Sequence, residues 1–308
     1  MFAADEAKTA GHVFPEDVFF LHMNEAGQPL VSVVVANYNY GRFLETAVRS
    51  VLTQCDADMM LPSGDRVELI VVDGGSTDNS LEVIRKYERR LAWWCSERDG
   101  GQSHALNKGF TRAAGKYLTW LNADDVMLPQ SLEAVARMIK GHPACRWFVG
   151  GSCWLDAELR LARYFRAHRF SGLRARHARL HVGGPSSFFA KALLEEAGGV
   201  DESFHFAMDL ELWARFYFRC GQEYVRTKAC VWGYRMHGDS KMSGLDVVPD
   251  SEKNKENRRR SDEEIARVCR MYGQGGRWGW LANVCSVSVA DALACAWRTW
   301  RMKGRRVI

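Results

Sequence analysis

Two adjacent carboxylates, Asp124 and Asp125, follow an apolar run that extends from Tyr117 to Leu121. Such a run is typical of a buried strand, and the acids after it would lie at the edge of the sheet. Neighbouring carboxylates repel each other unless a cation or hydrogen-bond donors neutralise them. Mg²⁺ and Mn²⁺ are commonly held by one or two carboxylates together with substrate phosphates. Taken alone, the pair also fits a solvated turn or a helix N-cap.

Three other predicted strands end in acids or amides. The apolar run 30–36 is followed by Asn37 and Asn39, the run 67–73 ends in Asp73, and the shorter run 91–96 is followed by Asp99. A helical pattern follows each run, and this alternation predicts parallel strands with right-handed crossovers. Ligands of such sheets bind at the carboxyl ends of the strands. The agreement of four strand ends favours a ligand site over unrelated turns.

The composition is that of an ordinary globular chain. It has 308 residues, 47% hydrophobic and 26% charged, which excludes a largely disordered protein. The formal net charge of +5 is too small to indicate nucleic-acid binding. Nine scattered cysteines without a CxxC pair argue against a metal–thiolate site and for a reducing compartment. No GxGxxG follows the first predicted strand, so an NAD enzyme fits poorly.

The two ends of the chain differ from its middle. Residues 1–28 lack the features of a signal peptide, so we expect the catalytic part to be cytoplasmic. The stretch 250–264 is polar and is predicted to be a solvated helix or linker. The tryptophan-rich stretch 278–297 is interrupted by polar residues and is followed by a basic tail. It suits an interfacial helix on the inner face of an anionic membrane, or else a helix packed on the domain.

Motif blocks spread over residues 31–243 resemble the inverting, family 2 type glycosyltransferases with a GT-A fold. The blocks are residues 31–39, 68–78, 99–103, 122–125, 184–189 and 208–213, followed by Arg235, His237 and Lys241. The resemblance implies an α/β fold with a Rossmann-like, mostly parallel sheet flanked by helices. The resemblance falls within a predicted GT-A domain at 29–245. Outside it we expect an N-terminal extension at 1–28, which shows no clear period, and a C-terminal helical and basic segment at 246–308.

The resemblance implies a role for each donor-side position. Asn37 and Asp73 would contact the nucleobase, and Asp99 would lie near the base or the ribose. Asp124 would contact the ribose or the donor sugar. Asp125 would bind a divalent cation, Mn²⁺ or Mg²⁺, that bridges the diphosphate.

The later positions would complete this implied site. Arg235 and Lys241 would belong to a loop over the diphosphate, and His237 would bind either the cation or a phosphate. Asp209 would be the general base for the acceptor hydroxyl. Without the resemblance, Asp209 fits a helix cap, and Arg235 and His237 fit ordinary surface residues.

Together these positions predict an inverting, metal-dependent glycosyltransferase. We expect a nucleotide-sugar donor, with a UDP-sugar as first choice, and a glycan or lipid-linked acceptor in surface polysaccharide biosynthesis. One alternative is a nucleotide-sugar or glycan-binding module with reduced turnover, because Asn122 and Met208 stand where many relatives carry acids. Another is a sugar nucleotidyltransferase, which would need a glycine-rich, basic loop in place of residues 37–41.

Overall fold

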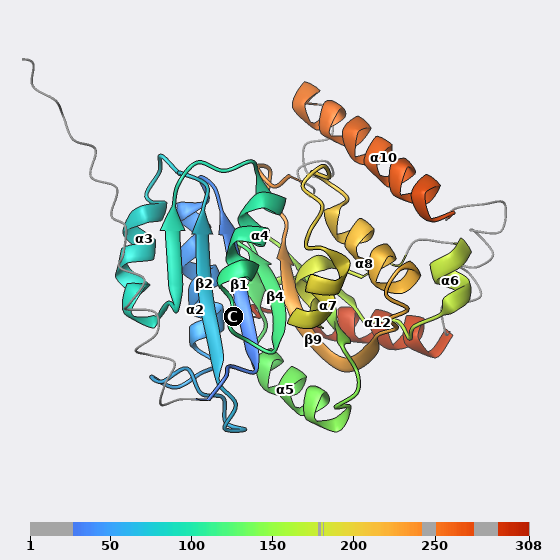
Figure 1. The fold of residues 1–308 in the computed structure, drawn as a ribbon, viewed down its shortest axis with the longest axis horizontal. Helices are drawn as coiled ribbons and strands as arrows, with labels where there is room; N and C mark the ends of the chain where they lie inside the picture. The colour runs from blue at the N-terminus through green and yellow to red at the C-terminus, as the bar shows by residue number, and fades with distance from the viewer. Residues whose placement is uncertain (1–26, 178–179, 181, 242–250, 274–288, 308) are drawn as a thin grey trace, which may run out of the picture.

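The protein was analysed as a computed structural model that describes residues 27–177, 180, 182–241, 251–273 and 289–307. Its first half alternates strands and helices (Figure 1). The strands are β1 (Val31–Asn37), β2 (Val67–Asp73), β3 (Trp93–Ser96) and β4 (Tyr117–Asn122). The intervening helices are α2 (Gly41–Leu52), α3 (Ser80–Tyr87), with the 3-10 turn η1 (Glu88–Arg90) after it, and α4 (Gln102–Arg112). The predicted strand–helix alternation is confirmed, although β3 begins two residues later than its apolar run.

The second half is more irregular. Its strands are β5 (Val126–Met127), β6 (Trp147–Leu155), β7 (Leu161–Phe165), β8 (Ser187–Ala190) and β9 (Val225–Arg235). Its helices are α5 (Ser131–Gly141), α6 (Gly172–His177), α7 (Lys191–Ala197), α8 (Met208–Phe218), α10 (Glu252–Tyr272) and α12 (Val289–Met302), with the 3-10 turn η2 (Gly184–Ser186) before β8. All the described strands join one sheet.

The nine-stranded sheet has the order β3-β2-β1-β4-β8-β6-β9-β5, with β7 beside β6. The pairs β1–β2, β1–β4 and β2–β3 are parallel, and their register sets Asn37 opposite Asp73 and Asp73 opposite Ser96. The polar ends of these strands are therefore level with one another, as expected of a parallel sheet. In the second half β9 runs parallel to β6 and antiparallel to β5. This pairing returns the chain to the acidic motif that directly precedes β5.

The core explains why β1 and β2 are almost continuously apolar. Helix α2 lies behind the strands and α4 lies in front of them in Figure 1, so both faces of these strands are covered. Helix α4 approaches β1 closely, because a Cβ on Gly109 would lie 2.4 Å from Val34 Cγ1. The polar exceptions pair with each other: Ser32 donates to the buried Glu68 carboxylate.

The C-terminal helix α12 packs on β7. Thr299 Oγ1 accepts the Tyr164 N–H at 3.1 Å, and Leu161 N–H donates to Arg305 O at 2.9 Å. The described part of the predicted interfacial segment therefore rests on the domain, while its first part, 278–288, lies outside the described residues. No helix among the described residues combines the length and the apolar content needed to cross a bilayer.

Candidate functional site

The first group of predicted residues meets at the ends of β1, β2 and β3. Asp73 is fully buried, and its oxygens accept Asn37 Nδ2 at 2.6 Å, Ser96 Oγ at 2.6 Å and Ser76 N at 2.9 Å. This carboxylate therefore ties three strand ends together. Asn37 Oδ1 is buried and has no hydrogen-bond partner among the described residues. An acceptor of this kind calls for a donor from a ligand.

Asp99 lies against the turn that follows β2. Its Oδ1 accepts the Gly101 N–H at 2.8 Å. A Cβ on Gly74 would lie 2.9 Å from Asp99 Oδ2, so a larger residue at position 74 would displace the Asp99 carboxylate. The turn itself is held by Gly74 N–H, which donates to Asn37 O at 2.9 Å. Asn37, Asp73 and Asp99 thus form one continuous group.

Asp125, the second acid of the motif, is fully buried. Its Oδ2 accepts Asn122 Nδ2 at 2.8 Å and Trp232 Nε1 at 3.0 Å, and its Oδ1 accepts Arg235 N at 3.0 Å. Burial, and next the charge of Asp124, raise the pKa of this carboxyl well above its usual range, against the pull of these three donors. Hydrogen-bond donors therefore relieve part of the repulsion that the sequence predicted for the pair.

Asp124 is the more accessible of the two acids, and it faces His237. The distance from Asp124 Oδ2 to His237 Nε2 is 3.1 Å. The His237 ring packs on Phe43, with 4.5 Å between ring centroids. The Asp124 carboxylate is a usual ligand type for Mn²⁺ or Mg²⁺, which take most of their other ligands from phosphate oxygens and water. Among the described residues no group of three or more His, Cys, Asp or Glu side chains could hold a metal.

Arg235 lies beside this pair and is only 5% exposed. Its guanidinium carbon lies 4.9 Å from the centre of the Phe43 ring. Burial lowers the pKa of Arg235, and the charges of Asp125 and Asp124 oppose that shift. Two of its donors, Nε and Nη2, are buried without a hydrogen-bond partner in the described part of the chain. Buried guanidinium donors of this kind fit a phosphate oxyanion.

Asp209 lies in the first turn of α8, beside a cleft of about 800 Å³. The lining of this cleft includes Asp209, Lys241, Asn122, Trp232 and Gly184. Burial raises the pKa of Asp209 to about 6, against the backbone N–H groups of Leu210 and Gly184 and the charge of Lys241. Burial also lowers the pKa of Lys241 to about 8. The cleft connects to the acidic motif, because Asn122 and Trp232 both donate to Asp125.

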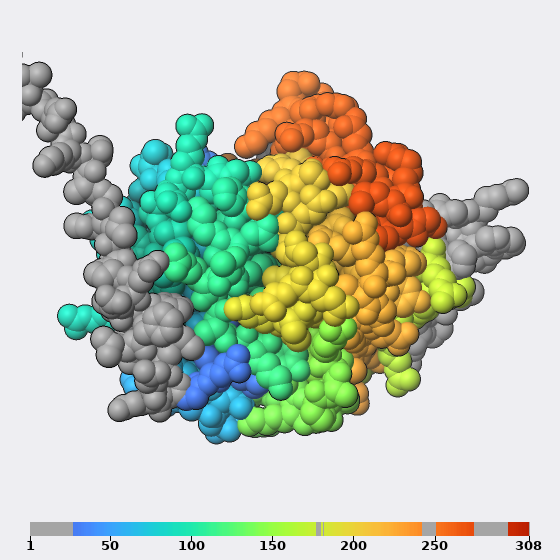
Figure 2. All heavy atoms as spheres, in the orientation of Figure 1, coloured from blue at the N-terminus to red at the C-terminus, as the bar shows by residue number. Residues whose placement is uncertain are grey.

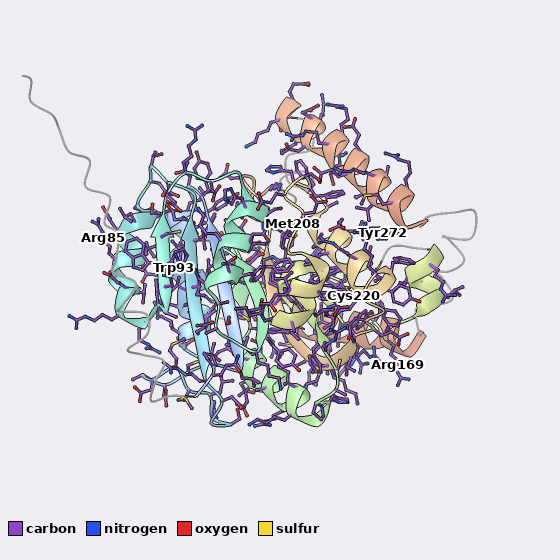
Figure 3. All side chains as sticks on the ribbon, viewed as in Figure 1. Arg85, Trp93, Arg169, Met208, Cys220 and Tyr272 are labelled. Atoms are coloured by element: carbon purple, nitrogen blue, oxygen red, sulfur yellow. The ribbon has the colours of Figure 1, made fainter. Side chains whose placement is uncertain are left out.

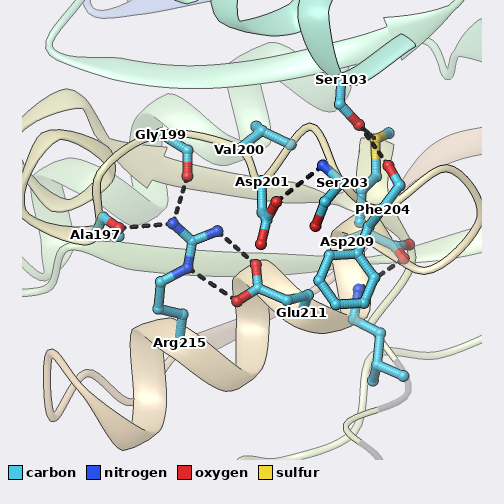
Figure 4. Close-up of polar contacts among 12 residues, drawn as sticks. Ser103, Ala197, Gly199, Val200, Asp201, Ser203, Phe204, Asp209, Glu211 and Arg215 are labelled. Carbon is cyan, nitrogen blue, oxygen red and sulfur yellow. Dashed lines mark hydrogen bonds and ion pairs between the residues drawn. The ribbon is translucent and has the colours of Figure 1, made fainter. Parts of the chain in front are cut away.

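Helix α8 is anchored by a buried ion pair (Figure 4). Arg215 is bound to Glu211, and its Nη1 also donates to Ala197 O at 2.6 Å and Gly199 O at 2.8 Å. At the start of the helix, Ser103 Oγ lies 3.1 Å from Met208 Sδ. These contacts connect α8, and with it Asp209, to α4 and to the segment after α7.

Sequence reasoning missed two residues that support this site. Trp232 donates to Asp125 from β9, and Glu264 of α10 accepts the Ala207 N–H at 2.9 Å beside the first turn of α8. A tryptophan in a strand and a glutamate in a polar helix carry no local signal of such roles. The polar stretch 250–264 forms the first part of α10, in line with the helix alternative, but it is not simply solvated, because Asn254 and Ser261 on it are buried.

Residues 32–195 match the family model described as Glycosyl transferase family 2, which covers more than half of the chain. The chain belongs to glycosyl transferase family 2. Over 207 residues the glycosyltransferase is 30% identical to an uncharacterized glycosyltransferase of Mycobacterium tuberculosis, covering 66% of this chain and 74% of that protein. It is 35% identical over 113 residues to an uncharacterized glycosyltransferase of Nostoc sp., where the match covers 36% of this chain and 33% of that protein.

Solved structures show the same fold. The S. aureus TarS fragment 1–349 in complex with UDP-GlcNAc has a TM-score of 0.53 at 17% identity, covering 78% of this chain and 72% of that one. The mannosyltransferase PcManGT of Pyrobaculum calidifontis, in complex with GDP-Man and Mn²⁺, has a TM-score of 0.51 at 16% identity, covering 92% and 85%. The predicted family, GT-A fold and glycosyltransferase class are confirmed, whereas the roles of single residues stay predictions.

Proposed function

We propose that this glycosyltransferase is inverting and metal-dependent, and that it moves a sugar from a nucleotide sugar to a hydroxyl of a glycan or lipid-linked acceptor. The observation that carries the proposal is the buried Arg235 guanidinium beside the Asp124–His237 pair. Its unpartnered donors favour an anion at the point where two metal-binding side chains meet. A nucleoside diphosphate supplies both a phosphate oxyanion and cation ligands.

The donor would bind across the strand ends, with its base toward Asn37, Asp73 and Asp99. Asn37 offers a buried acceptor atom there. We propose a UDP-sugar as donor, which is supported by the UDP-GlcNAc complex of the similar TarS fragment. Because PcManGT was solved in complex with GDP-Man, a GDP-sugar is the second donor to test.

We propose that His237 and Asp124 contact Mn²⁺ or Mg²⁺ together with oxygens of the diphosphate, and that Asp125, the predicted metal ligand, supports the cation with its charge from behind. Asp124 and His237 would offer one oxygen and one nitrogen donor, and the buried Asp125 carboxylate would be neutralised by the cation and by its three hydrogen-bond donors. When bound, the cation would act as a Lewis acid toward the leaving diphosphate. The Mn²⁺ complex of PcManGT supports this assignment.

Asp209 would act as the general base on the acceptor side of the cleft. Its raised pKa of about 6 leaves it ionised at neutral pH while keeping it a stronger base than an ordinary carboxylate. It would take the proton of the acceptor hydroxyl as the oxygen attacks the anomeric carbon from the face opposite the diphosphate. A single displacement of this kind gives inversion, and Lys241 and Arg235 would supply positive charge near the departing phosphates.

The binding-module alternative was based on Asn122 and Met208. Both residues have structural contacts: Asn122 joins Gln102 to Asp125, and Met208 contacts Ser103. These contacts give both residues a structural role, and the three acids Asp124, Asp125 and Asp209 are all present. We therefore favour the active transferase.

We also propose that α12 contacts an anionic membrane surface. Trp297 is 54% exposed and Trp300 is 80% exposed, while Thr299 and Arg298 of the same helix contact Tyr164 of the domain. Basic residues follow these indoles in the sequence, namely Arg301, Lys303, Arg305 and Arg306. Exposed tryptophans flanked by basic side chains suit the interface of an anionic bilayer.

The deciding experiment measures nucleoside diphosphate release from UDP-sugars and GDP-Man, with Mn²⁺, with Mg²⁺ and with a chelator. Asp124→Asn, Asp125→Asn and Asp209→Asn are compared with Asp58→Asn, whose side chain is on an exposed loop. Release that requires the metal and all three acids, with an inverted product, supports the proposal. Metal-dependent nucleotide binding without release from any donor, even with added glycan acceptors, would favour the binding module.

A further inference from the structure

Helix α8 has no side-chain cap from its own N-cap residue, Ala207. The carboxylate of Glu264, on the distant helix α10, instead binds the N–H groups of the turn that leads into this helix. Glu264 Oε2 accepts the N–H groups of Phe206 at 2.6 Å, Ala207 at 2.9 Å and His205 at 3.0 Å. Three consecutive N–H groups that converge on one carboxylate form an anion nest at the positive end of a helix.

The rest of α10 holds Glu264 in this position. Arg267 Nη2 donates to Ser203 Oγ at 3.1 Å, and its guanidinium lies 4.3 Å from the centre of the Phe204 ring. Figure 3 labels Tyr272, the last residue of α10. Its hydroxyl donates to Glu211 Oε1 at 2.9 Å, and its ring stacks on Phe218. In Figure 2 the orange atoms of α10 lie directly on the gold atoms of α8. Helix α10, which carries Glu264, therefore contacts the chain both before the 205–207 turn, at Ser203 and Phe204, and after it, at Glu211 and Phe218.

Lys241 contacts the same turn at the backbone carbonyl of His205. Its Nζ donates to His205 O and lies 4.6 Å from the centre of the Phe206 ring. Glu264 therefore binds the three N–H groups of residues 205–207, and Lys241 binds the carbonyl of His205. Asp209 follows this turn by two residues, so a displacement of the turn moves its carboxylate.

Helix α10 also forms part of the cleft wall. Its contribution is Arg258, Ser261, Asp262 and Ile265. One helix therefore both lines the cleft and caps the turn before Asp209. Residues 252–272 lie outside the range that matches the family model.

We infer that Glu264 is a positioning residue for transfer: by capping the 205–207 turn, it sets the place of the Asp209 carboxylate in the cleft. The inference rests on the proposed role of Asp209 as general base. A base must lie within hydrogen-bond reach of the acceptor hydroxyl, and a displacement of about 1 Å can cost on the order of a hundredfold in rate. Glu264 itself does not touch the reacting atoms in this scheme.

The test compares Glu264→Gln with Glu263→Gln in the full chain. Glu263 is the adjacent residue, but its carboxylate is exposed and pairs with Arg259 of the same helix. We expect Glu264→Gln to lower kcat by about tenfold or more, with KM for the donor and Kd for UDP unchanged within about twofold. Glu263→Gln should leave all three constants unchanged. Amide hydrogen exchange at His205–Ala207 should become faster in Glu264→Gln alone.

Two results would overturn the inference. In the first, kcat of Glu264→Gln equals that of the control. In the second, kcat falls together with UDP affinity and the unfolding temperature, which would make Glu264 a general stability residue. If the wild-type chain transfers no sugar, the proposed function fails. The role of Glu264 in holding the turn is then tested by amide exchange alone, and unchanged exchange at His205–Ala207 in Glu264→Gln would reject that role.

Discussion

Asp209 and Lys241 are the two cleft residues whose charge depends most on burial. The pKa of Asp209 rises to about 6 and that of Lys241 falls to about 8. Between these two values Asp209 is ionised and Lys241 is protonated. The proposed chemistry needs an ionised Asp209 and a protonated Lys241. These two residues therefore predict that transfer is fastest between about pH 6 and pH 8.

The first prediction concerns the acidic side of that window. Because the pKa of Asp209 is raised to about 6, we expect kcat/KM for transfer to fall as the pH decreases through about 6, well above the range of an ordinary aspartate. The measurement is kcat/KM against pH with saturating metal. Asp209→Asn should reduce the rate by about 10²–10⁴-fold. An acidic limb near pH 4 would contradict the assignment of Asp209 as base.

A second prediction separates the function of Asp209 from its effect on stability. Its pKa is raised in the folded state, so the folded protein binds the proton more tightly than the unfolded chain does. The ionised group therefore destabilises the fold above pH 6, and this cost disappears below the unfolded pKa of about 4. We expect Asp209→Asn to raise the free energy of unfolding by about 3 kcal/mol at pH 7.5, since each unit of the pKa shift corresponds to about 1.4 kcal/mol.

Urea unfolding at pH 7.5 and at pH 4 tests this sign. The variant and the wild type should be equally stable at pH 4 and differ at pH 7.5. A variant that is less stable at pH 7.5 would show that Asp209 serves as a structural cap instead of a residue kept for chemistry.

At the scale of elements, α8 depends on one buried ion pair. Glu211 and Arg215 are only 2% and 6% exposed. Arg215→Met would leave the Glu211 charge buried without its cation, which costs about 3–5 kcal/mol. The carbonyls of Ala197 and Gly199 would lose their donor as well. We therefore expect a large loss of stability in a urea titration.

The matched control for this element is Arg137→Met. Arg137 also pairs with a glutamate at the i,i+4 spacing, Glu133, but its side chain is 74% exposed. Exposed pairs of this kind contribute less than about 1 kcal/mol. Equal effects of the two substitutions would mean that burial of the Glu211–Arg215 pair does not determine the anchoring of α8.

At the scale of the whole molecule, α12 presents two exposed indoles on the domain surface. We expect the full chain to co-sediment with vesicles that contain anionic lipid, and the bound fraction to decrease with salt, because the basic residues of α12 and its tail act through screened charges. The double variant Trp297→Ser, Trp300→Ser should abolish binding. Met271→Ser, an exposed apolar side chain on α10, should not.

This whole-molecule prediction fails in either of two ways. Wild-type protein that stays in the supernatant at low salt would reject the membrane contact. Binding that persists in the tryptophan double variant would assign it to a different surface. Neither outcome changes the transfer reaction, because α12 packs on β7 and does not line the cleft.

Local patterns in the sequence determined the first half of the fold and the polar strand ends. The runs that became β1, β2 and β4 are apolar because both faces of these strands are covered, and the polar residues at their ends meet at one edge because the strands are parallel. The pattern of apolar residues and the turns between strands depend on residues that are close together in the sequence, so they can be predicted from it. Asn37, Asp73, Asp99 and the Asp124–Asp125 pair could therefore be grouped without a structure.

Only the tertiary structure decided what surrounds those acids. The two-residue strand β5 pairs with β9, and this pairing brings Trp232 and Arg235 to Asp125 across about a hundred residues of sequence. Glu264 likewise caps a turn 57 residues away from it. Hydrogen bonds between distant segments depend on packing that no local pattern encodes, because a polar residue in a helix looks the same whether it faces water or a neighbouring helix.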